Sequence, residues 1–132
     1  MSAPHRNLEE CATAVVDAGF KIHRDVGPGL LESVYEAFLA EQLVRRGLRV
    51  ERQVNITASY DGITVPNAFR VDLLVEGQLV VEIKSLERLA PVHSKQLLTY
   101  LRLMHLPLGF LLNFGGATFR EGIRRLVNDH TP

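Results

Sequence analysis

Three charged residues carry the chemistry that this sequence suggests. Glu82 and Lys84 lie two positions apart in one apolar segment, and Asp72 lies in the apolar segment before it. Carboxylate oxygens are the ligands that Mg²⁺ and Mn²⁺ prefer, and protein-bound Mg²⁺ keeps positions open for water and phosphate oxygens. A lysine beside the cation can orient a bound water or stabilise charge that develops on a phosphoryl group. The three residues therefore have the parts for metal-assisted hydrolysis of a phosphodiester.

A predicted β-hairpin brings the two carboxylates together. Residues 63–75 and 79–85 have strand-like patterns, and the turn at 76–78 contains a glycine. A three-residue turn pairs Val75 with Leu79 and keeps the apolar residues of both strands on one face, whereas a two-residue turn mixes the faces. That turn predicts Asp72 beside Glu82, about 5 Å apart at Cβ. Two carboxylates so close repel each other unless one binds a proton or a cation lies between them.

The same alternation assigns the residues of the first hairpin strand to two faces. Arg70 shares the face of Asp72, which makes its guanidinium a candidate phosphate contact. The opposite face is expected to be apolar and to consist of Phe69, Val71, Leu73 and Val75. The alternative interpretation is a solvated strand face on which Lys84 only neutralises neighbouring carboxylates.

The elements around the hairpin predict a single α/β domain with a mixed central sheet, spanning residues 1–132. Asn7, with a glutamate three residues later, predicts the start of the first helix. Asp61 and Gly62 predict a tight turn between two strands, and Pro66 predicts an irregularity after it. The expected order is two helices (from residue 7 and at 30–46), three strands (50–60, 63–75 and 79–85), a helix (93–104), a strand (106–113) and one further element at 119–127. The apolar stripe of the second helix is expected to consist of Leu31, Val34, Phe38, Leu39 and Leu43.

The composition limits the kinds of protein that this chain can be. Its 15 basic and 15 acidic side chains give zero net charge, so no bulk electrostatic attraction to nucleic acid is expected. No run of residues reaches the roughly 20 apolar positions of a membrane span, and the N-terminus lacks the apolar core of a signal peptide. Cys11 is the only cysteine, which excludes an intrachain disulfide and a cysteine-based zinc site. A cytoplasmic protein is expected.

Taken together, these motifs resemble the PD-(D/E)XK nuclease superfamily and, within it, the GxxExxY family. The resemblance runs from about residue 7 to the last element. It lies in the order and spacing of residues 29–35, 69–75, 81–84, 91–93, 96–101 and 111–115. It implies a restriction-endonuclease-like core. The proline of the superfamily's name is absent here, because Val71 precedes Asp72.

The resemblance implies a role for each charged residue. Asp72 and Glu82 would bind Mg²⁺ or Mn²⁺, and Lys84 would be the catalytic lysine. Glu32 matches the acidic residue that this superfamily often places on a helix beside the sheet, where it binds the metal directly or through water.

Further residues are candidates for contacts with the substrate. Gln96 and Tyr100 match a QxxxY motif on the helix after the core strands and would brace Lys84 or the substrate strand. Tyr35 can hydrogen-bond Glu32 or fill the core, and His93 can cap its helix or touch substrate. The candidate substrate contacts are Arg70, Tyr35, His93 and Lys95.

The function implied by the resemblance is a Mg²⁺-dependent nuclease, with DNA favoured as the nucleic acid. No membrane contact is expected, and a homodimer would let so small a nuclease cut two strands. The alternative is a non-catalytic subunit that binds nucleic acid or joins an assembly while it retains a nuclease-like fold. The zero net charge favours this alternative.

Overall fold

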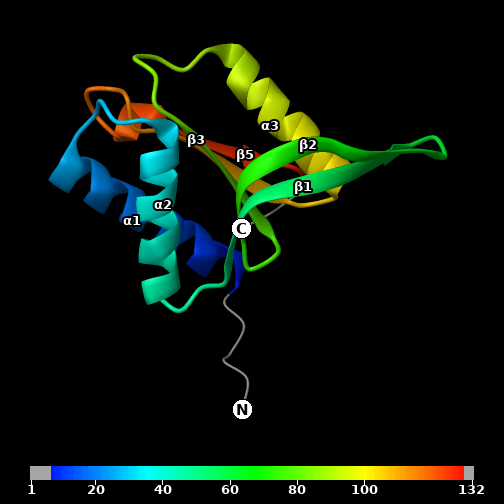
Figure 1. The fold of residues 1–132 in the computed structure, drawn as a ribbon, viewed down its shortest axis with the longest axis horizontal. Coiled ribbons are helices and arrows are strands. Elements are labelled where there is room, and N and C mark those ends of the chain that lie inside the picture. The colour runs from blue at the N-terminus through cyan, green and yellow to red at the C-terminus, as the bar shows by residue number, and fades with distance from the viewer. Residues whose placement is uncertain (1–6, 130–132) are drawn as a thin grey trace.

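A computed structural model of the chain describes residues 7–129 and has a mixed sheet between two layers of helix (Figure 1). The helices are α1 (Leu8–Val26), α2 (Glu32–Arg45) and α3 (Pro91–Met104). The strands are β1 (Val50–Tyr60), β2 (Ile63–Val75), β3 (Leu79–Lys84), β4 (Leu108–Asn113) and β5 (Ile123–Val127), and a 3₁₀ turn, η1 (Arg120–Gly122), precedes β5. The predicted domain of residues 1–132 also includes 1–6 and 130–132, which lie outside the described part. No helix within residues 7–129 has the length and apolar character needed to cross a membrane.

The sheet has the strand order β1-β2-β3-β4-β5. It is mixed because β3 and β4 are parallel while the other neighbouring pairs are antiparallel, and α3 supplies the crossover that parallel neighbours need. Val75 pairs with Leu79, so the predicted three-residue turn is confirmed. The α/β class with a mixed central sheet is also confirmed, and residues 119–127, whose structure the sequence left open, contain η1 and β5.

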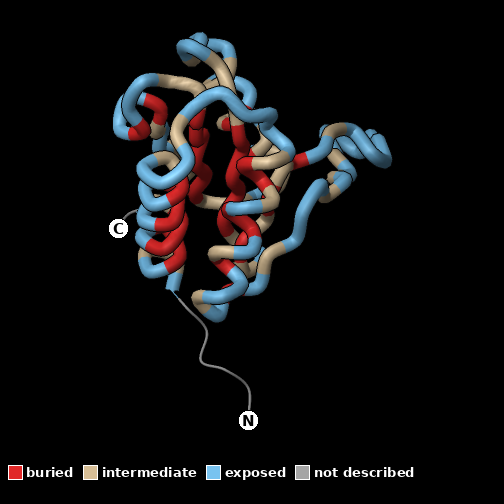
Figure 2. The backbone as a smooth tube through the Cα atoms, turned by 60° about the vertical axis from the view of Figure 1, so that its left-hand side comes forward, coloured by how far each residue is buried: buried red, intermediate tan, exposed pale blue. Residues whose placement is uncertain are grey.

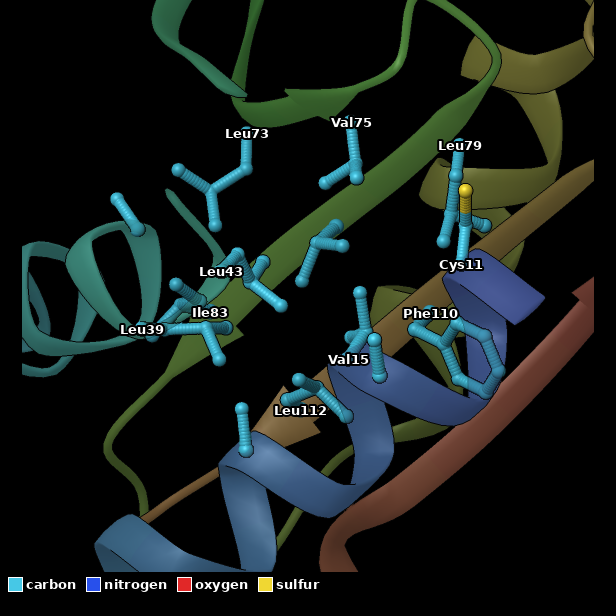
Figure 3. Packing of buried hydrophobic residues seen from close by; sticks show 14 of the residues in the cluster. Cys11, Val15, Leu39, Leu43, Leu73, Val75, Leu79, Ile83, Phe110 and Leu112 are labelled. Carbon is cyan, nitrogen blue, oxygen red and sulfur yellow. The ribbon is translucent and has the colours of Figure 1, made fainter. Parts of the chain in front are cut away.

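Apolar side chains bury both faces of the sheet. α1 and α2 cover one face, where Cys11 and Leu43 lie in the same cluster as Leu112 of β4 (Figure 3). α3 covers the other face, where Leu97 packs with Leu111. The central strands β3 and β4 are therefore buried on both sides and form a rigid platform for the residues at their ends.

α2 buries a different face from the one that its sequence predicts. The helix begins at Glu32, and Leu31 before it is 74% exposed. Phe38 is 42% exposed, so the predicted apolar stripe is correct at Leu39 and Leu43 but wrong at these two positions. The buried residues of α2 are Tyr35, Glu36, Leu39, Ala40 and Leu43. The buried residues are spaced four apart along the helix. They include Glu36, although hydrophobicity alone predicts an apolar residue at a buried position.

β1 and β2 extend beyond the body of the domain as a hairpin whose tip is exposed (Figure 2). Asp61 and Gly62 have φ values of 50° and 76°, as the predicted tight turn requires. The register of the two strands shifts after Ile56, and Asn67 has a φ of 50° beside Pro66. The irregularity predicted from Pro66 is therefore confirmed.

The apolar residues of β2 change faces at Asp72. Leu73 packs in the cluster beneath α1 and α2, whereas Val71 packs in the cluster beneath α3. The prediction of one apolar face along residues 69–75 is therefore wrong. On the paired strand, Gln53 has a φ of 52°, and this left-handed residue interrupts the two-residue alternation of β1 opposite Asp72.

Candidate active site

Asp72 and Glu82 face each other where β2 and β3 separate. The last regular pair of the two strands is Leu73 with Val81. Beyond it, the N–H of Asp72 donates to Oε1 of Glu82 (3.1 Å), and the N–H of Ile83 donates to Oδ2 of Asp72 (2.8 Å). Each carboxylate therefore replaces a backbone carbonyl as the acceptor from the neighbouring strand. The predicted proximity of the two carboxylates is confirmed.

Glu82 is a buried acid, with only 8% of the residue exposed. Burial first, and then the negative charge of Asp72, raise the pKa of Glu82 from 4.5 to about 8. The N–H of Asp72 and the ammonium of Lys84 act in the opposite direction. In the absence of a cation, Glu82 therefore holds a proton at neutral pH, which removes the repulsion between the two carboxylates.

Two more of the predicted residues act on this pair. Lys84 is half-buried at the end of β3, and its charge lowers the pKa of Glu82. Tyr100 of α3 stacks on Phe69 of β2, with ring centroids 4.0 Å apart. Burial first, and then the charges of Glu82 and Asp72, raise the pKa of the Tyr100 hydroxyl. The ammonium and the phenol thus lie in the electrostatic field of the acidic pair, although they come from elements far apart in the sequence.

A cavity of about 550 Å³ lies beside Asp72 and opens to solvent. Its charged and amide-bearing lining residues are Glu32, Glu36, Gln53, Arg70 and Asp72. Arg70 is exposed and forms no ion pair with another residue in the described part of the chain, so its guanidinium is available to a phosphate oxygen. Glu82 and Lys84 do not line this cavity, which therefore reaches the acidic pair from the side of Asp72.

Tyr35 stabilises the loop between α1 and α2, which corrects one predicted role. Its hydroxyl donates to the carbonyl of Gly27 (2.6 Å) and accepts from the N–H of Leu30 (3.2 Å). Its ring stacks on Phe114 with centroids 4.6 Å apart, and the residue is fully buried. Tyr35 therefore holds the loop before Glu32, and the predicted substrate contact by Tyr35 is wrong.

The other predicted residues lie on the first turns of α3. Nδ1 of His93 accepts the N–H of Ala90 at 3.0 Å, so His93 caps the helix, which was one of its two expected roles. Lys95 and Gln96 are exposed, and their side chains form no hydrogen bond or ion pair with other residues among 7–129. Gln96 precedes Tyr100 by one helical turn, so its amide is exposed on the side of α3 that carries the tyrosine.

The fold and these residues agree with the result of a family comparison. A family model for the PD-(D/E)XK nuclease superfamily matches residues 9–126. The chain belongs to this superfamily. Members of the superfamily generally hydrolyse phosphodiester bonds and typically use divalent metals such as Mg²⁺. Comparisons of the chain with curated proteins and with solved structures give no match.

The acidic pair of this PD-(D/E)XK core fits a Mg²⁺ ion. Among residues 7–129, no three or more His, Cys, Asp or Glu side chains form a group that could hold a metal ion, so Glu32 does not complete such a set with Asp72 and Glu82. Two carboxylates suffice for Mg²⁺, which is usually bound through one or two of them together with water and substrate phosphates. Because burial keeps a proton on Glu82, the pair holds one negative charge fewer than its two carboxylates could carry. A divalent cation allows both to be ionised.

Two polar residues of the site were missed by sequence reasoning. Glu36 is 4% exposed and forms an ion pair with Arg52 at 3.0 Å. Gln53 donates from Nε2 to Oε1 of Glu36 and to Oδ1 of Asp72, the latter at 3.3 Å. The available signal for Glu36 was its position one turn after Glu32. Gln53 carried no signal beyond being a polar residue in an alternating strand.

Proposed function

We propose that this protein is a Mg²⁺-dependent nuclease that hydrolyses phosphodiester bonds in DNA, with Mn²⁺ as an effective substitute. The observation that carries the proposal is the pair formed by Asp72 and Glu82, in which each carboxylate accepts a backbone N–H from the facing strand and Glu82 is buried. The pair lies beside a cavity lined by Arg70, a cation with no acidic partner among the described residues. Membership of the PD-(D/E)XK superfamily supports the same chemistry.

The roles of the charged residues follow from their places around the pair. Asp72 and Glu82 would hold the cation through carboxylate oxygens, and Glu32 would reach it through water. Bound Mg²⁺ would supply a Lewis acid that polarises the phosphate and lowers the pKa of a water ligand. Arg70 binds a phosphate oxygen and orients the phosphodiester. Lys84 orients the attacking water and stabilises the negative charge that develops on the phosphoryl oxygens.

The residues of α3 extend the site toward the nucleic acid. Tyr100 presents its hydroxyl beside the acidic pair, and its stacking on Phe69 restricts the ring to one orientation. Gln96 and Lys95 are exposed on the same helix and contact the substrate strand in this proposal. A cytoplasmic location and a homodimer that cuts both strands are part of the same proposal.

We also propose that the chain belongs to the GxxExxY family, because each residue of that motif has a structural role in or next to the loop between α1 and α2. Gly29 has a φ of 113°, a conformation that side chains disfavour. Glu32 starts α2 and lines the cavity. Tyr35 secures the loop through its hydroxyl. The motif thus brings a carboxylate to the cavity from a firmly held loop.

The test is cleavage of end-labelled single-stranded and duplex DNA by protein that has been stripped with EDTA and then supplied with Mg²⁺ or Mn²⁺. The variants are Asp72→Ala and Lys84→Ala. Asp61→Asn at the tip of the hairpin is the control, because asparagine tolerates the left-handed backbone found there. We expect the wild type and Asp61→Asn to cleave only with the cation present, and both site variants to lose activity by at least about a hundredfold.

The outcome separates the two candidate functions. Metal-dependent cleavage that survives unchanged in Asp72→Ala or Lys84→Ala contradicts the proposed mechanism. DNA binding without turnover in the wild type, together with full tolerance of Lys84→Ala, favours the non-catalytic nucleic-acid-binding subunit.

A further inference from the structure

Gln53 has a backbone conformation that is rare in a β-strand. Its φ is 52°, in the left-handed region that residues with a side chain seldom adopt. It lies between the pairs Arg52 with Leu73 and Val54 with Val71, so it is directly opposite Asp72 on β2. Strained backbone of this kind persists only where the surrounding structure enforces it, and it concentrates at functional sites.

This conformation lets two consecutive residues of β1 reach one carboxylate. Successive side chains of a regular strand point to opposite faces, yet Arg52 and Gln53 both bond to Glu36. Nε of Arg52 donates to Oε2 of Glu36 at 3.0 Å, and Nε2 of Gln53 donates to Oε1 of the same residue. Glu36 is therefore neutralised by Arg52 and holds the amide of Gln53 from a buried position on α2.

The amide of Gln53 connects this anchor to the candidate metal site. The same Nε2 donates to Oδ1 of Asp72 at 3.3 Å, while Oδ2 of Asp72 accepts the N–H of Ile83 at 2.8 Å. Both oxygens of Asp72 are therefore bound, one to a side chain from β1 and one to the backbone of β3. Hydrogen bonds of this kind fix the rotation of a carboxylate and direct its remaining lone pairs.

We propose that Gln53, anchored by Glu36 and Arg52, is a positioning residue that sets the orientation of the Asp72 carboxylate for a divalent cation. The proposal rests on the proposed function in so far as Asp72 binds the cation. Glu36 acts only as the anchor, because its carboxylate is buried and its charge is neutralised by the ion pair with Arg52. The left-handed backbone of Gln53 is retained because a relaxed strand would turn its amide away from Asp72.

The substitution Gln53→Gly separates this role from a purely structural one. Glycine adopts a positive φ without strain, so this variant relieves the backbone while it removes the amide. Asn67→Gly is the matched control, because Asn67 has a φ of 50° in the same hairpin but does not line the cavity. Gln53→Ala, which removes the amide without relieving the backbone, is the second variant.

Three measurements are made on each full-length variant after EDTA treatment. These are the urea midpoint of unfolding, the affinity for Mn²⁺ by calorimetry, and the amide resonance of Ile83 by NMR. For Gln53→Gly we expect a midpoint close to that of the wild type, because relief of the backbone offsets the lost hydrogen bond to Glu36. We also expect Mn²⁺ affinity about tenfold lower and a shifted Ile83 resonance. Gln53→Ala is expected to lose affinity to the same extent, and Asn67→Gly is expected to change neither the affinity nor the resonance.

The proposal is overturned if Gln53→Gly leaves the Ile83 resonance and the Mn²⁺ affinity unchanged. It is also overturned if affinity falls only in parallel with the urea midpoint, since that marks a structural role. A wild-type protein that neither binds Mn²⁺ nor cleaves DNA contradicts the proposed function instead. The Ile83 resonance then decides by itself: a shift in Gln53→Gly supports positioning of Asp72, and no shift refutes it.

Discussion

The buried Glu82 carboxyl makes the stability of the metal-free protein depend on pH. Its pKa is about 8 in the folded chain and returns to its ordinary value of 4.5 when unfolding exposes it. Between pH 4.5 and about pH 8, Glu82 therefore holds a proton in the folded state that it has lost in the unfolded state. Folding is therefore favoured most below pH 4.5, and this contribution is lost as the pH rises toward 8. Glu82→Gln removes the titrating group and keeps its shape.

The size of the effect follows from the width of that window. Where the folded state holds one proton more than the unfolded state, the free energy of unfolding falls by about 1.4 kcal/mol for each pH unit. Between pH 5.5 and pH 8, the Glu82 carboxyl should therefore reduce the free energy of unfolding by about 3 kcal/mol. This is a large share of the roughly 5–15 kcal/mol that stabilises a typical domain.

The assay is urea unfolding of EDTA-treated wild type and Glu82→Gln at pH 5.5, 7 and 8. The difference between the two proteins cancels the titration of all other groups. We expect Glu82→Gln to gain about 3 kcal/mol relative to the wild type from the lowest pH to the highest. Glu121→Gln, which changes an exposed carboxylate, is the control and should follow the wild type.

A difference between wild type and Glu82→Gln that stays constant over this range would refute the reasoning. It would mean that Glu82 ionises in the folded protein as readily as in the unfolded chain. Its burial beside Asp72 would then not suppress its charge, and a cation would have no proton to displace at neutral pH.

Two further predictions follow from the same geometry. Because Mn²⁺ must displace the proton of Glu82, the affinity for Mn²⁺ should rise between pH 6 and 8, and each ion bound at pH 7 should release about one proton. Calorimetry in two buffers of different ionisation enthalpy measures this release. An affinity for Mn²⁺ that does not depend on pH contradicts the prediction. Tyr35→Phe should lower the free energy of unfolding by about 1–3 kcal/mol, because it leaves the carbonyl of Gly27 and the N–H of Leu30 without their partner. Urea unfolding checks this loss, and Mn²⁺ affinity close to that of the wild type would show that Tyr35 has no direct part in metal binding.

The acidic pair could be predicted from the sequence because its position depends on local rules. The spacing of apolar residues selects a three-residue turn, and the turn determines which residues of β2 and β3 are neighbours. The start of α1 was predictable for the same reason: Oδ1 of Asn7 accepts the N–H of Glu10 at 2.8 Å, as the spacing of the two residues indicates. In each case a short segment contains all the information that its geometry needs.

Gln53 could not be placed opposite Asp72 from the sequence. A tight turn at Asp61 and Gly62 without any irregularity puts Glu51 opposite Asp72, and this was the only register available from the turn itself. The bulge near Pro66 takes up two more residues of β2 and moves Gln53 into that place. Pro66 indicated that an irregularity exists, but the number of residues in a bulge depends on the packing of the whole hairpin.

The faces of α2 and β2 were mispredicted for a related reason. Hydrophobicity assigned Phe38 to the core and left Glu36 unassigned, yet the structure buries Glu36 because Arg52 and Gln53 satisfy its carboxylate. Those partners come from another element, so no pattern within α2 could reveal them. The same contacts hold Gln53 in the conformation that breaks the alternation of β1.

The departures from local rules converge on Asp72. Glu82 is buried beside it at a cost in ionisation, Gln53 is strained opposite it, and the apolar residues of β2 change faces at its position. Elsewhere the turn at Asp61 and Gly62, the cap of α1 and the buried strands follow the preferences of their own residues. In a sequence whose elements otherwise agree with one fold, conflicts gathered at one residue indicate selection for something other than stability. In the proposed function, a cation between Asp72 and Glu82 would allow both carboxylates to be ionised and would use the orientation that Gln53 gives to Asp72, so the proposed cation site would account for the buried acid and the strained residue together.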